Sequence, residues 1–451
     1  MKLFFVLAFS ILALVFQPHY GVKAQTCDSE DGTCSSDGST KRKLPANQEL
    51  QLKVTNKSNY RVDVHWDDGK FGSLVSTLEA KGGNSDFNTF AGHGFFVTRH
   101  GVKEGLFDPE TDKQLKYKMS GETEIESWEI PKNAAPSKNK CQDRFSICEQ
   151  YSKNGGCWNS PGWMIVHCCR SCDEELDASR LLDPKVRCSK ENLNVTGPTW
   201  EPGDLNTLFT SWATDPKFKE YEPVVLSSPT GVVDGKPGDK KTNDPWVITF
   251  DKFLTSAEAD ALVRGGESIG FERSTNQGAV NDLGEQERVV STTRTSSNAW
   301  CVQQCENQPE VRSVSRRIED VTGVPQKNYE SFQILNYGVN EFYRMHHDSS
   351  GSENVPPGNR ILTFFLYLSD VEEGGETQFN KLGVKGLKVK PKKGRALIWP
   401  SVKDDNPHTW DPRMYHEAMP VIKGKKYAAN HWIHLYDYVG PNEWGCTGSF
   451  S

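Results

Sequence analysis

Long apolar stretches are scarce in this chain of 451 residues. No internal run is long enough to cross a bilayer, which excludes an internal membrane span. Basic residues are also in deficit, because 53 Lys and Arg stand against 60 Asp and Glu and leave a net charge of −7. A generic nucleic-acid binder needs a dominant basic surface and is excluded on this ground. The 38 Gly and 24 Pro are too few for a collagen-like or linker composition.

The rest of the composition is typical of compact domains. Hydrophobic residues make up 35% of the chain and aromatic residues 10%, which is enough to build cores and excludes wholesale disorder. The length predicts about three domains. Strand-like alternation recurs along the chain, so we expect a mainly β, multidomain protein.

Residues 1–24 have the pattern of a secretory signal peptide. Lys2 precedes the apolar run 3–16, and Val22 and Ala24 supply small residues before a cut after Ala24. An uncleaved signal anchor is the alternative, and it would be the chain's only membrane contact. All 12 cysteines lie beyond this leader, which predicts paired cysteines and the secretory pathway, either the ER lumen or secretion. The sequons at Asn56 and Asn194 are predicted glycosylation sites.

A polar linker, residues 25–45, precedes a segment of short strands at 46–132. Residues 50–54 and 60–66 alternate apolar and polar side chains, with turn residues between such runs, which predicts a small β-sandwich. Three short motifs in it resemble the β-domain of the von Hippel–Lindau family; an ordinary β-sandwich without a binding role is the alternative. The motifs are Val54-Thr55-Asn56-Lys57-Ser58, Val64-His65-Trp66 and Gly92-His93-Gly94-Phe95-Phe96.

Six cysteines crowd the next segment, 141–175, which could extend to residue 188. This density in a secreted chain predicts a disulfide-stapled mini-domain; zinc is the alternative, but only His167 accompanies the thiols. The order of cysteines resembles a ShK-toxin-like domain, although Glu175 stands where its final cysteine is usual. Cys169 or Cys188 therefore remains open as the partner that closes the last bridge. The resemblance implies disulfides at Cys141, Cys148, Cys157, Cys168 and Cys172.

The C-terminal half begins after a predicted linker at 199–243, which is rich in Pro, Gly, Asp and Lys. Residues 246–250 read as a strand, and Thr255 and Glu258 form a capping box that predicts a helix start. Further on, Cys301 and Cys305 could pair with each other or separately with Cys446.

Candidate metal ligands lie in this last domain. Alternation along a strand would point His346 and Asp348 to the same side, and one imidazole beside one carboxylate is part of a two-His-one-carboxylate iron site. His416 supplies the second imidazole. It is preferred over His408 because of its separation in sequence from Lys426, which lies ten residues further on. Lys426 lies in an apolar strand, where an ammonium is costly unless it meets an anion such as a dicarboxylate cosubstrate.

Residues 245–440 resemble the prolyl 4-hydroxylase family of iron(II)/2-oxoglutarate dioxygenases. The resemblance implies a double-stranded β-helix, or jelly-roll, core with flanking helices. Its motifs are Asn336-Tyr337-Gly338, Tyr343-x-x-His346-x-Asp348, Arg360-x-x-Thr363, the run from Tyr367 to Thr377, Trp399-Pro400-Ser401, His416-x-x-x-Pro420-Val421-x-x-Gly424-x-Lys426 and Asn430-x-Trp432.

The resemblance also implies roles for particular residues. The iron ligands would be His346, Asp348 and His416. The 2-oxoglutarate site would consist of Lys426, Tyr337 and Thr377, with His434 behind it. Five further residues would line a peptide groove, although the aromatic ones could instead be core residues and the charged ones a surface pair: Tyr343, Trp432, Arg360, Arg294 and Glu330.

The implied activity is hydroxylation of peptidyl proline in secretory-pathway proteins, with Fe²⁺, 2-oxoglutarate and O₂ as requirements and L-ascorbate as a protectant. Two alternatives remain: hydroxylation of another residue such as lysine, or of a small molecule, and an inactive secreted binding protein. The expected partner is a proline-containing protein or peptide. The polar segment 274–291 is expected to be a flap over the peptide or a passive loop.

Overall fold

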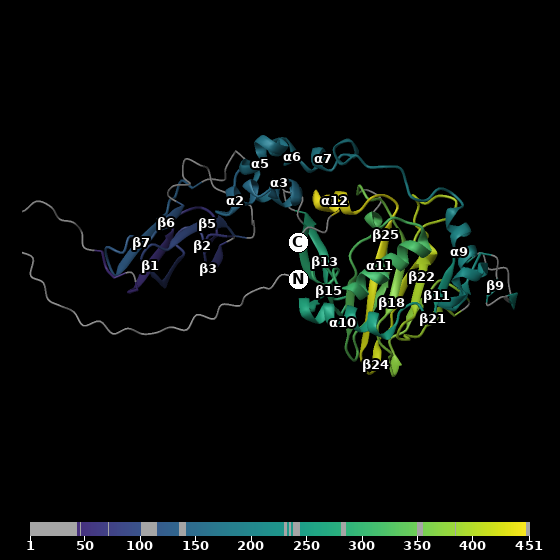
Figure 1. Cartoon of the computed structure of the whole chain (residues 1–451). Coiled ribbons are helices and arrows are strands. Elements are labelled where there is room, and N and C mark those ends of the chain that lie inside the picture. The colour runs from purple at the N-terminus through teal and green to yellow at the C-terminus, as the bar shows by residue number, and fades with distance from the viewer. Residues whose placement is uncertain are drawn as a thin grey trace, which may run out of the picture.

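The computed structural model describes residues 43–45, 47–70, 72–100, 115–134, 141–229, 232–233, 236–237, 244–280, 286–349, 355–383 and 385–447. Figure 1 shows strands in the N-terminal part, short helices in the teal part and a large mixed part towards the C-terminus. The predicted leader, most of the first linker, Cys27 and Cys34 lie outside the described residues. Among the described residues, no helix is both long and apolar enough to span a membrane.

The N-terminal strands form two sheets around one core. One sheet has the order β4-β1-β7 and the other β3-β2-β5-β6. Inward positions of β1 are buried while outward ones are not, so the predicted alternation is confirmed over 50–54. It also holds over 62–65 in β2, but Trp66 near the end of that strand is exposed. The strands are β1 (Glu49–Asn56), β2 (Val62–Asp67), β3 (Ser73–Leu78), β4 (Asn84–Phe90), β5 (Gly94–Arg99), β6 (Lys116–Lys118) and β7 (Ile125–Ile130).

The structure contradicts glycosylation at Asn56. The residue is 0% exposed, and its amide nitrogen donates hydrogen bonds to the carbonyls of Tyr60, Leu78 and Glu79. A glycan would have to occupy this same nitrogen, which the folded sheet encloses. Asn194 is exposed and stays a predicted site.

Short helices and three disulfides make up residues 141–193. The bridges are Cys141–Cys169, Cys148–Cys168 and Cys157–Cys172. Cys169 therefore closes the set within the segment, whereas Cys188 pairs with Cys446 near the end of the chain. The helices are α2 (Cys148–Lys153), α3 (Gly156–Asn159), α4 (Pro161–His167), α5 (Cys169–Leu176), α6 (Ala178–Leu181), α7 (Pro184–Arg187) and α8 (Lys190–Leu193).

Two facing sheets form the C-terminal domain. The larger has the order β12-β15-β16-β25-β18-β22-β11-β8 and the smaller β17-β23-β20-β21. Side chains of both sheets share one buried cluster, a two-layer arrangement consistent with the expected jelly-roll. The larger sheet contains β8 (Pro223–Ser227), β11 (Val247–Phe250), β12 (Glu272–Arg273), β15 (Ser297–Trp300), β16 (Gln333–Tyr337), β18 (Arg360–Tyr367), β22 (Ala396–Pro400) and β25 (Lys426–His434). The smaller contains β17 (Tyr343–His346), β20 (Thr377–Phe379), β21 (Leu387–Val389) and β23 (His416–Ala418).

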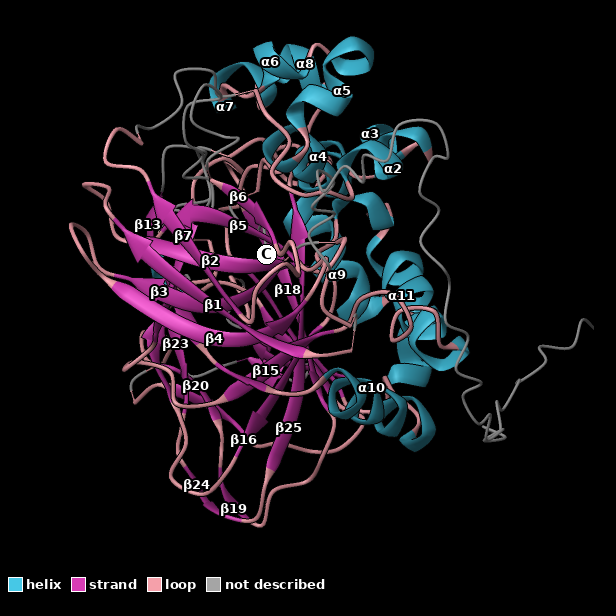
Figure 2. Ribbon diagram, turned by 90° about the vertical axis from the view of Figure 1, so that its left-hand side faces the viewer, coloured by secondary structure: helices cyan, strands magenta, loops and turns pink. Residues whose placement is uncertain are grey.

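Three two-stranded pairs and several helices complete this domain. The pairs are β9 (Val232–Val233) with β10 (Lys236–Pro237), β13 (Thr275–Val280) with β14 (Gln286–Val290), and β19 (Glu373–Gly374) with β24 (Val421–Lys423). The helices are α9 (Asp204–Thr214), α10 (Ser256–Ile269), α11 (Pro309–Thr322), α12 (Val439–Glu443) and the 3₁₀ turns η1 (Pro216–Tyr221), η2 (Gln326–Asn328) and η4 (Pro412–Met414). Figure 2 shows α9, α10 and α11 on one side of the strands.

The predicted capping box is confirmed. The Thr255 hydroxyl accepts a bond from the N–H of Glu258, whose carboxylate accepts one from the N–H of Thr255. α10 and α11 pack their apolar faces on the outer side of the large sheet. The helices therefore cover that face and leave the space between the two sheets for the site.

The prediction of a linker over 199–243 is wrong for most of that segment. It contains α9 and β8, and β8 is an edge strand of the large sheet paired with β11. Phe209 and Trp212 of α9 are fully buried in the outer core, and the Trp212 indole donates to the carbonyl of Val321. Apolar residues widely spaced among polar ones hid this from a composition-based reading. Residues 230–231, 234–235 and 238–243 lie outside the described part.

Cys301 and Cys305 form a disulfide with each other. The proposed flap corresponds to the β13–β14 hairpin, but its tip at 281–285 lies outside the described residues.

Candidate active site

Three side chains that could hold a metal ion converge between the two sheets. His346, Asp348 and His416 each offer one ligand atom, and these atoms lie within 4.8 Å of one another. Each imidazole Nε2 is 3.7 Å from the same carboxylate oxygen, Asp348 Oδ1. His408, the other histidine considered, is not part of this cluster.

A strand irregularity brings the first ligand into place. β17 pairs with β23 through Tyr343 opposite Ala418 and His346 opposite His416, so two residues on β17 face one on β23. Such a bulge lets residues three apart face the same way. Tyr343 consequently stacks on His346, with ring centroids 3.5 Å apart. Asp348 lies beyond the end of the strand, so simple alternation does not explain its position.

Backbone carbonyls fix the tautomers of both histidines. His346 Nδ1 lies 2.9 Å from the carbonyl oxygen of Arg344, and His416 Nδ1 lies 2.9 Å from that of Met414. A carbonyl only accepts, so each Nδ1 carries a proton and each Nε2 is the ring nitrogen that faces the cluster and can bind a metal. Burial lowers the pKa of His346 to about 3, which keeps this imidazole neutral.

The carboxylate ligand is held ionised. Burial by itself would raise the pKa of Asp348, but His416, His346 and a bond from the Thr363 hydroxyl bring it to about 2. Thr363 Oγ1 donates to Asp348 Oδ2 at 2.6 Å, which leaves Oδ1 facing the two imidazoles. The arrangement is therefore two imidazole nitrogens and one ionised carboxylate, the donor set of two-His-one-carboxylate iron(II) sites.

Lys426 is a fully buried basic residue. It lies at the start of β25, is 0% exposed, and its Nζ has no hydrogen-bond partner among the described residues. Burial lowers its pKa to about 7. The rings of Tyr337, Phe365 and Tyr367 lie 5.2 to 5.6 Å from Nζ, and the carboxylate of Glu376 opposes the effect of burial on the pKa. A buried ammonium in such a setting calls for an anionic ligand.

Tyr337 and Thr377, the other predicted cosubstrate residues, lie close to Lys426 or to one of the rings around it. Thr377 Oγ1 is 2.8 Å from the hydroxyl of Tyr367, one of the rings around Lys426. The glycine at 375 has φ +72°, and a Cβ there would lie 3.5 Å from Lys426 Cδ. The structure thus brings the three predicted cosubstrate residues together.

The predicted groove residues split into two groups. Tyr343 lies under Arg294, whose guanidinium is 5.0 Å from its ring. With His346 it lines a cavity of about 430 Å³, which also includes Thr293, Arg344, Met345 and Glu417. Tyr343 therefore faces a cavity, whereas Arg294 packs behind its ring and is not among the lining residues.

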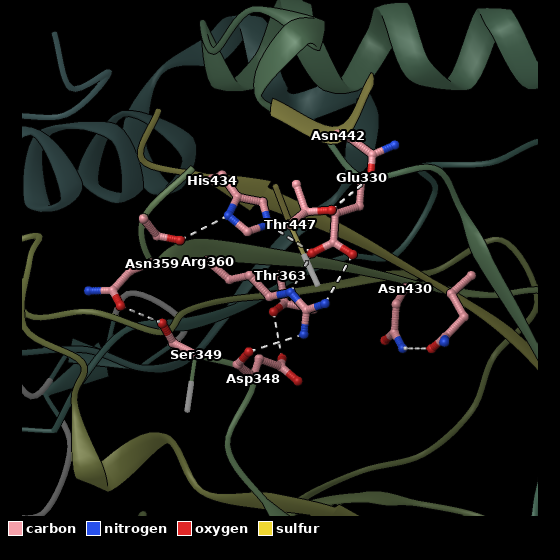
Figure 3. Close-up of polar contacts among 12 residues, drawn as sticks. Glu330, Asp348, Ser349, Asn359, Arg360, Thr363, Asn430, His434, Asn442 and Thr447 are labelled. Atoms are coloured by element: carbon pink, nitrogen blue, oxygen red, sulfur yellow. Dashed lines mark hydrogen bonds and ion pairs between the residues drawn. The ribbon is translucent and has the colours of Figure 1, made fainter. Parts of the chain in front are cut away.

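The second group is an internal network and corrects the expectation for Glu330. Glu330 is 2% exposed and accepts two bonds from Arg360, at 2.5 and 3.0 Å, so it supports the groove and does not line it; nor is it a surface charge. Arg360 also donates to the carbonyl of Asp348 at 3.2 Å and lies 3.8 Å over the ring of Trp432. Figure 3 shows its guanidinium between Glu330 and Asp348. His434 binds Glu330 at 2.8 Å.

Sequence reasoning assigned no role to Thr363 or to the two carbonyls that fix the histidines. Thr363 was visible only as part of the Arg360-x-x-Thr363 spacing, which gives no partner. The two carbonyls belong to the backbone, which is common to all residues, so no residue type in the sequence could indicate their role.

The class of protein follows from comparison with known families. Residues 332–434 match the family model of the 2OG-Fe(II) oxygenase superfamily, a span that contains the triad and Lys426. The chain is an iron(II)- and 2-oxoglutarate-dependent dioxygenase.

Similarity to individual proteins narrows this class. The chain is 34% identical over 213 residues to probable prolyl 4-hydroxylase 8 of Arabidopsis thaliana, covering 43% of this chain and 70% of that protein. It is 31% identical over 245 residues to prolyl 4-hydroxylase 2 of the same plant, covering 49% of this chain and 79% of that protein. A solved viral collagen prolyl hydroxylase of Paramecium bursaria Chlorella virus-1 is 26% identical, with a TM-score of 0.33 and coverage of 42% of this chain and 96% of that one. The chain belongs to the prolyl 4-hydroxylase family.

The residues present fit the groups that this family uses. Two imidazoles with free Nε2 atoms and one ionised carboxylate match a facial iron(II) site. The unpaired ammonium of Lys426 matches one end of a dicarboxylate.

Proposed function

We propose that this protein hydroxylates peptidyl proline in secretory-pathway proteins. His346, Asp348 and His416 would hold iron(II), and Lys426 would bind the distal carboxylate of 2-oxoglutarate with help from Tyr337 and Thr377. The observation that carries the proposal is the buried Lys426 ammonium, which has no hydrogen-bond partner among the described residues and lies in the same domain as the triad. An inert descendant would have no reason to keep an uncompensated charge at this cost.

The bound groups supply one overall reaction. Iron(II) and 2-oxoglutarate convert O₂ and a C–H bond into succinate, CO₂ and a C–OH group. The chain's own residues orient these reactants: Thr363 holds one oxygen of Asp348 away from the metal side, and the apolar rings around Lys426 exclude water from the charge pair. The cavity beside His346, lined by Tyr343 and Met345, has room for a substrate side chain.

The test uses the full chain with Fe²⁺, 2-oxoglutarate, ascorbate and a proline-rich peptide. We expect the peptide to gain one oxygen atom on proline, with one succinate released per oxygen added, as located by mass spectrometry. Oxygen found only on lysine, or succinate release unaffected by any peptide, would contradict the prolyl assignment. We also propose that ascorbate sustains turnover, as a rise in total product per enzyme would show.

A His346→Ala variant is the matched control for the metal site. It is expected to lose succinate release because one of three ligands is gone, while its circular dichroism spectrum and cooperative unfolding persist. Turnover equal to that of the unaltered protein would rule out the proposed iron ligands.

The N-terminal modules are proposed to be accessory. The three short-range disulfides and small helices of residues 141–193 support a ShK-toxin-like domain, and the two-sheet sandwich supports a von Hippel–Lindau β-domain-like module. Five disulfides among the described residues support an oxidising compartment, the ER lumen or the exterior. Secretion of a tagged chain with a cleaved leader would test this, and a cytosolic, reduced product would contradict it.

A further inference from the structure

Tyr438 lies where the last strand leads into the C-terminal helix α12. The residue is 8% exposed, and its ring stacks on that of His434 with centroids 4.8 Å apart and an angle of 25° between the planes. Its N–H donates to the carbonyl of Lys327 at 2.8 Å. A flat ring pressed on an imidazole restricts rotation of that imidazole.

The cysteine-rich module holds α12 from the other side. Cys446, just after the helix, is joined to Cys188 by a disulfide that spans 258 residues of sequence. Trp444 packs against the buried cluster of that module, and the N–H of Cys446 donates to the carbonyl of Pro441. Tyr438 is therefore fixed between the catalytic domain and the disulfide-rich module.

Both ring nitrogens of His434 have hydrogen-bond partners. Its Nδ1 lies 3.0 Å from the carbonyl oxygen of Gly358, and its Nε2 lies 2.8 Å from Glu330 Oε1. Rotation of this ring would weaken both contacts. The ring plane set by Tyr438 is thus the plane in which His434 meets Glu330.

Glu330 passes this constraint to the metal site. Burial alone would raise the pKa of Glu330, but Arg360 and His434 bring it to about 2, so it stays ionised. Its two bonds hold the Arg360 guanidinium, which donates to the Asp348 carbonyl. A carboxylate that loses one of its supports lets the arginine, and with it the main chain at Asp348, relax.

We propose that Tyr438 is a positioning residue for the metal centre, acting through His434, Glu330 and Arg360 on Asp348. The inference rests on the proposed metal site. It makes the C-terminal helix and its disulfide to the cysteine-rich module a brace of the catalytic unit. Loss of a group bonded directly to a metal ligand typically weakens metal affinity by about 10- to 100-fold, and for Tyr438, which acts through three intervening residues, we expect the lower end of this range.

The experiment titrates the full chain with Co²⁺ and follows the visible absorption of the bound ion, a readout that needs no turnover. We expect Tyr438→Ala to raise the Co²⁺ dissociation constant by about tenfold or more. Tyr438→Phe keeps the stacked ring and is expected to stay within about threefold of the unaltered chain. Tyr438→Leu, which keeps bulk without a flat ring, should resemble the alanine variant and serves if that variant folds poorly.

Tyr221→Ala is the matched control. Its ring also packs in the core, 5.6 Å from that of Phe250 and 5.4 Å from that of Phe253, but within the described part of the chain no contact links it to Glu330 or Arg360. It is expected to lower the melting temperature without shifting Co²⁺ affinity. Equal Co²⁺ affinity in all Tyr438 variants, or an equal loss in Tyr221→Ala, would overturn the inference. An unaltered chain that binds no Co²⁺ would instead overturn the metal site itself.

Discussion

Replacing Lys426 by methionine separates two effects of its charge: the loss of folding stability when it is buried, and the binding of 2-oxoglutarate. The ammonium is fully buried without a partner among the described residues, and burial lowers its pKa from 10.5 to about 7. In the unfolded chain the same group keeps its ordinary pKa. The folded, ligand-free protein therefore binds fewer protons than the unfolded chain between about pH 7 and about pH 10.5.

The size of this cost follows from the pKa shift. At pH 7 the difference corresponds to about 4 kcal/mol of lost stability, an order-of-magnitude figure that removal of the charge should partly return. The cost is full below about pH 7 and is relieved as the pH rises towards 10.5. A bound dicarboxylate offsets it, and the loss of such a buried pair weakens binding by about 3–5 kcal/mol, or at least roughly a hundredfold.

Two measurements check these expectations. Denaturant unfolding should show ligand-free Lys426→Met to be more stable than the unaltered chain at neutral pH, with a difference that shrinks at alkaline pH. Thermal unfolding with and without 2-oxoglutarate should show that the variant loses the stabilisation that the ligand gives the unaltered chain.

Lys425→Met is the control, because Lys425 is the exposed neighbour whose ammonium lies 4.7 Å from the Tyr427 ring. It should change neither quantity by more than about 0.5 kcal/mol. The reasoning is refuted if Lys426→Met keeps the 2-oxoglutarate stabilisation, or if its ligand-free form is less stable than the Lys425 variant.

Two further predictions concern buried ionisable groups away from Lys426 and its neighbours. His431 is buried, with its ring stacked 3.9 Å from that of Phe332, and burial lowers its pKa to about 3 against the opposing effect of Glu330. As the pH falls below 6.5, the imidazole of His431 is protonated in the unfolded chain but not in the folded one, so the unaltered protein loses stability. His431→Phe removes this effect. Between about pH 7 and about pH 5 the variant should therefore lose about 2 kcal/mol less stability than the unaltered chain, measured by urea unfolding. An identical pH dependence would contradict this. In the sandwich, Glu126 accepts bonds from Tyr117 and from Ser120, and Glu126→Gln should cost the sandwich about 2 kcal/mol in denaturant unfolding while 2-oxoglutarate still stabilises the catalytic domain. Loss of the ligand effect in that variant would show that the two parts do not act separately.

Much of the candidate site could be predicted from the sequence, because its chemistry depends on rare residue types in unfavourable places. Burying the charge of a lysine in an apolar strand costs folding free energy, so the position of Lys426 predicts an anionic ligand even when the fold is not known. The strand alternation that selected His346 and Asp348 was a weaker basis. The bulge in β17 orients His346, and Asp348 lies after the strand has ended.

The fold was predictable where side-chain periodicity is strong and not where burial depends on distant partners. The strands of the sandwich and the start of α10 follow local rules. Residues 204–227 do not, because the aromatic side chains of α9 are buried only by α11 and the large sheet, far away in the sequence. Composition alone therefore favoured a linker.

The support of the metal site shows the same limit more sharply. The sequence placed Glu330 and Arg360 in a peptide groove or a surface charge pair, and His434 behind the cosubstrate. The register of β18 with β25 instead sets Arg360 opposite His434, and Glu330, which contacts both, is buried. Replacing any one of these charged residues is therefore expected to destabilise the network, because it leaves the next charge buried without a partner. A residue such as Tyr438, which carries no charge and touches no ligand, then gains influence over Asp348 through the histidine that it holds in plane.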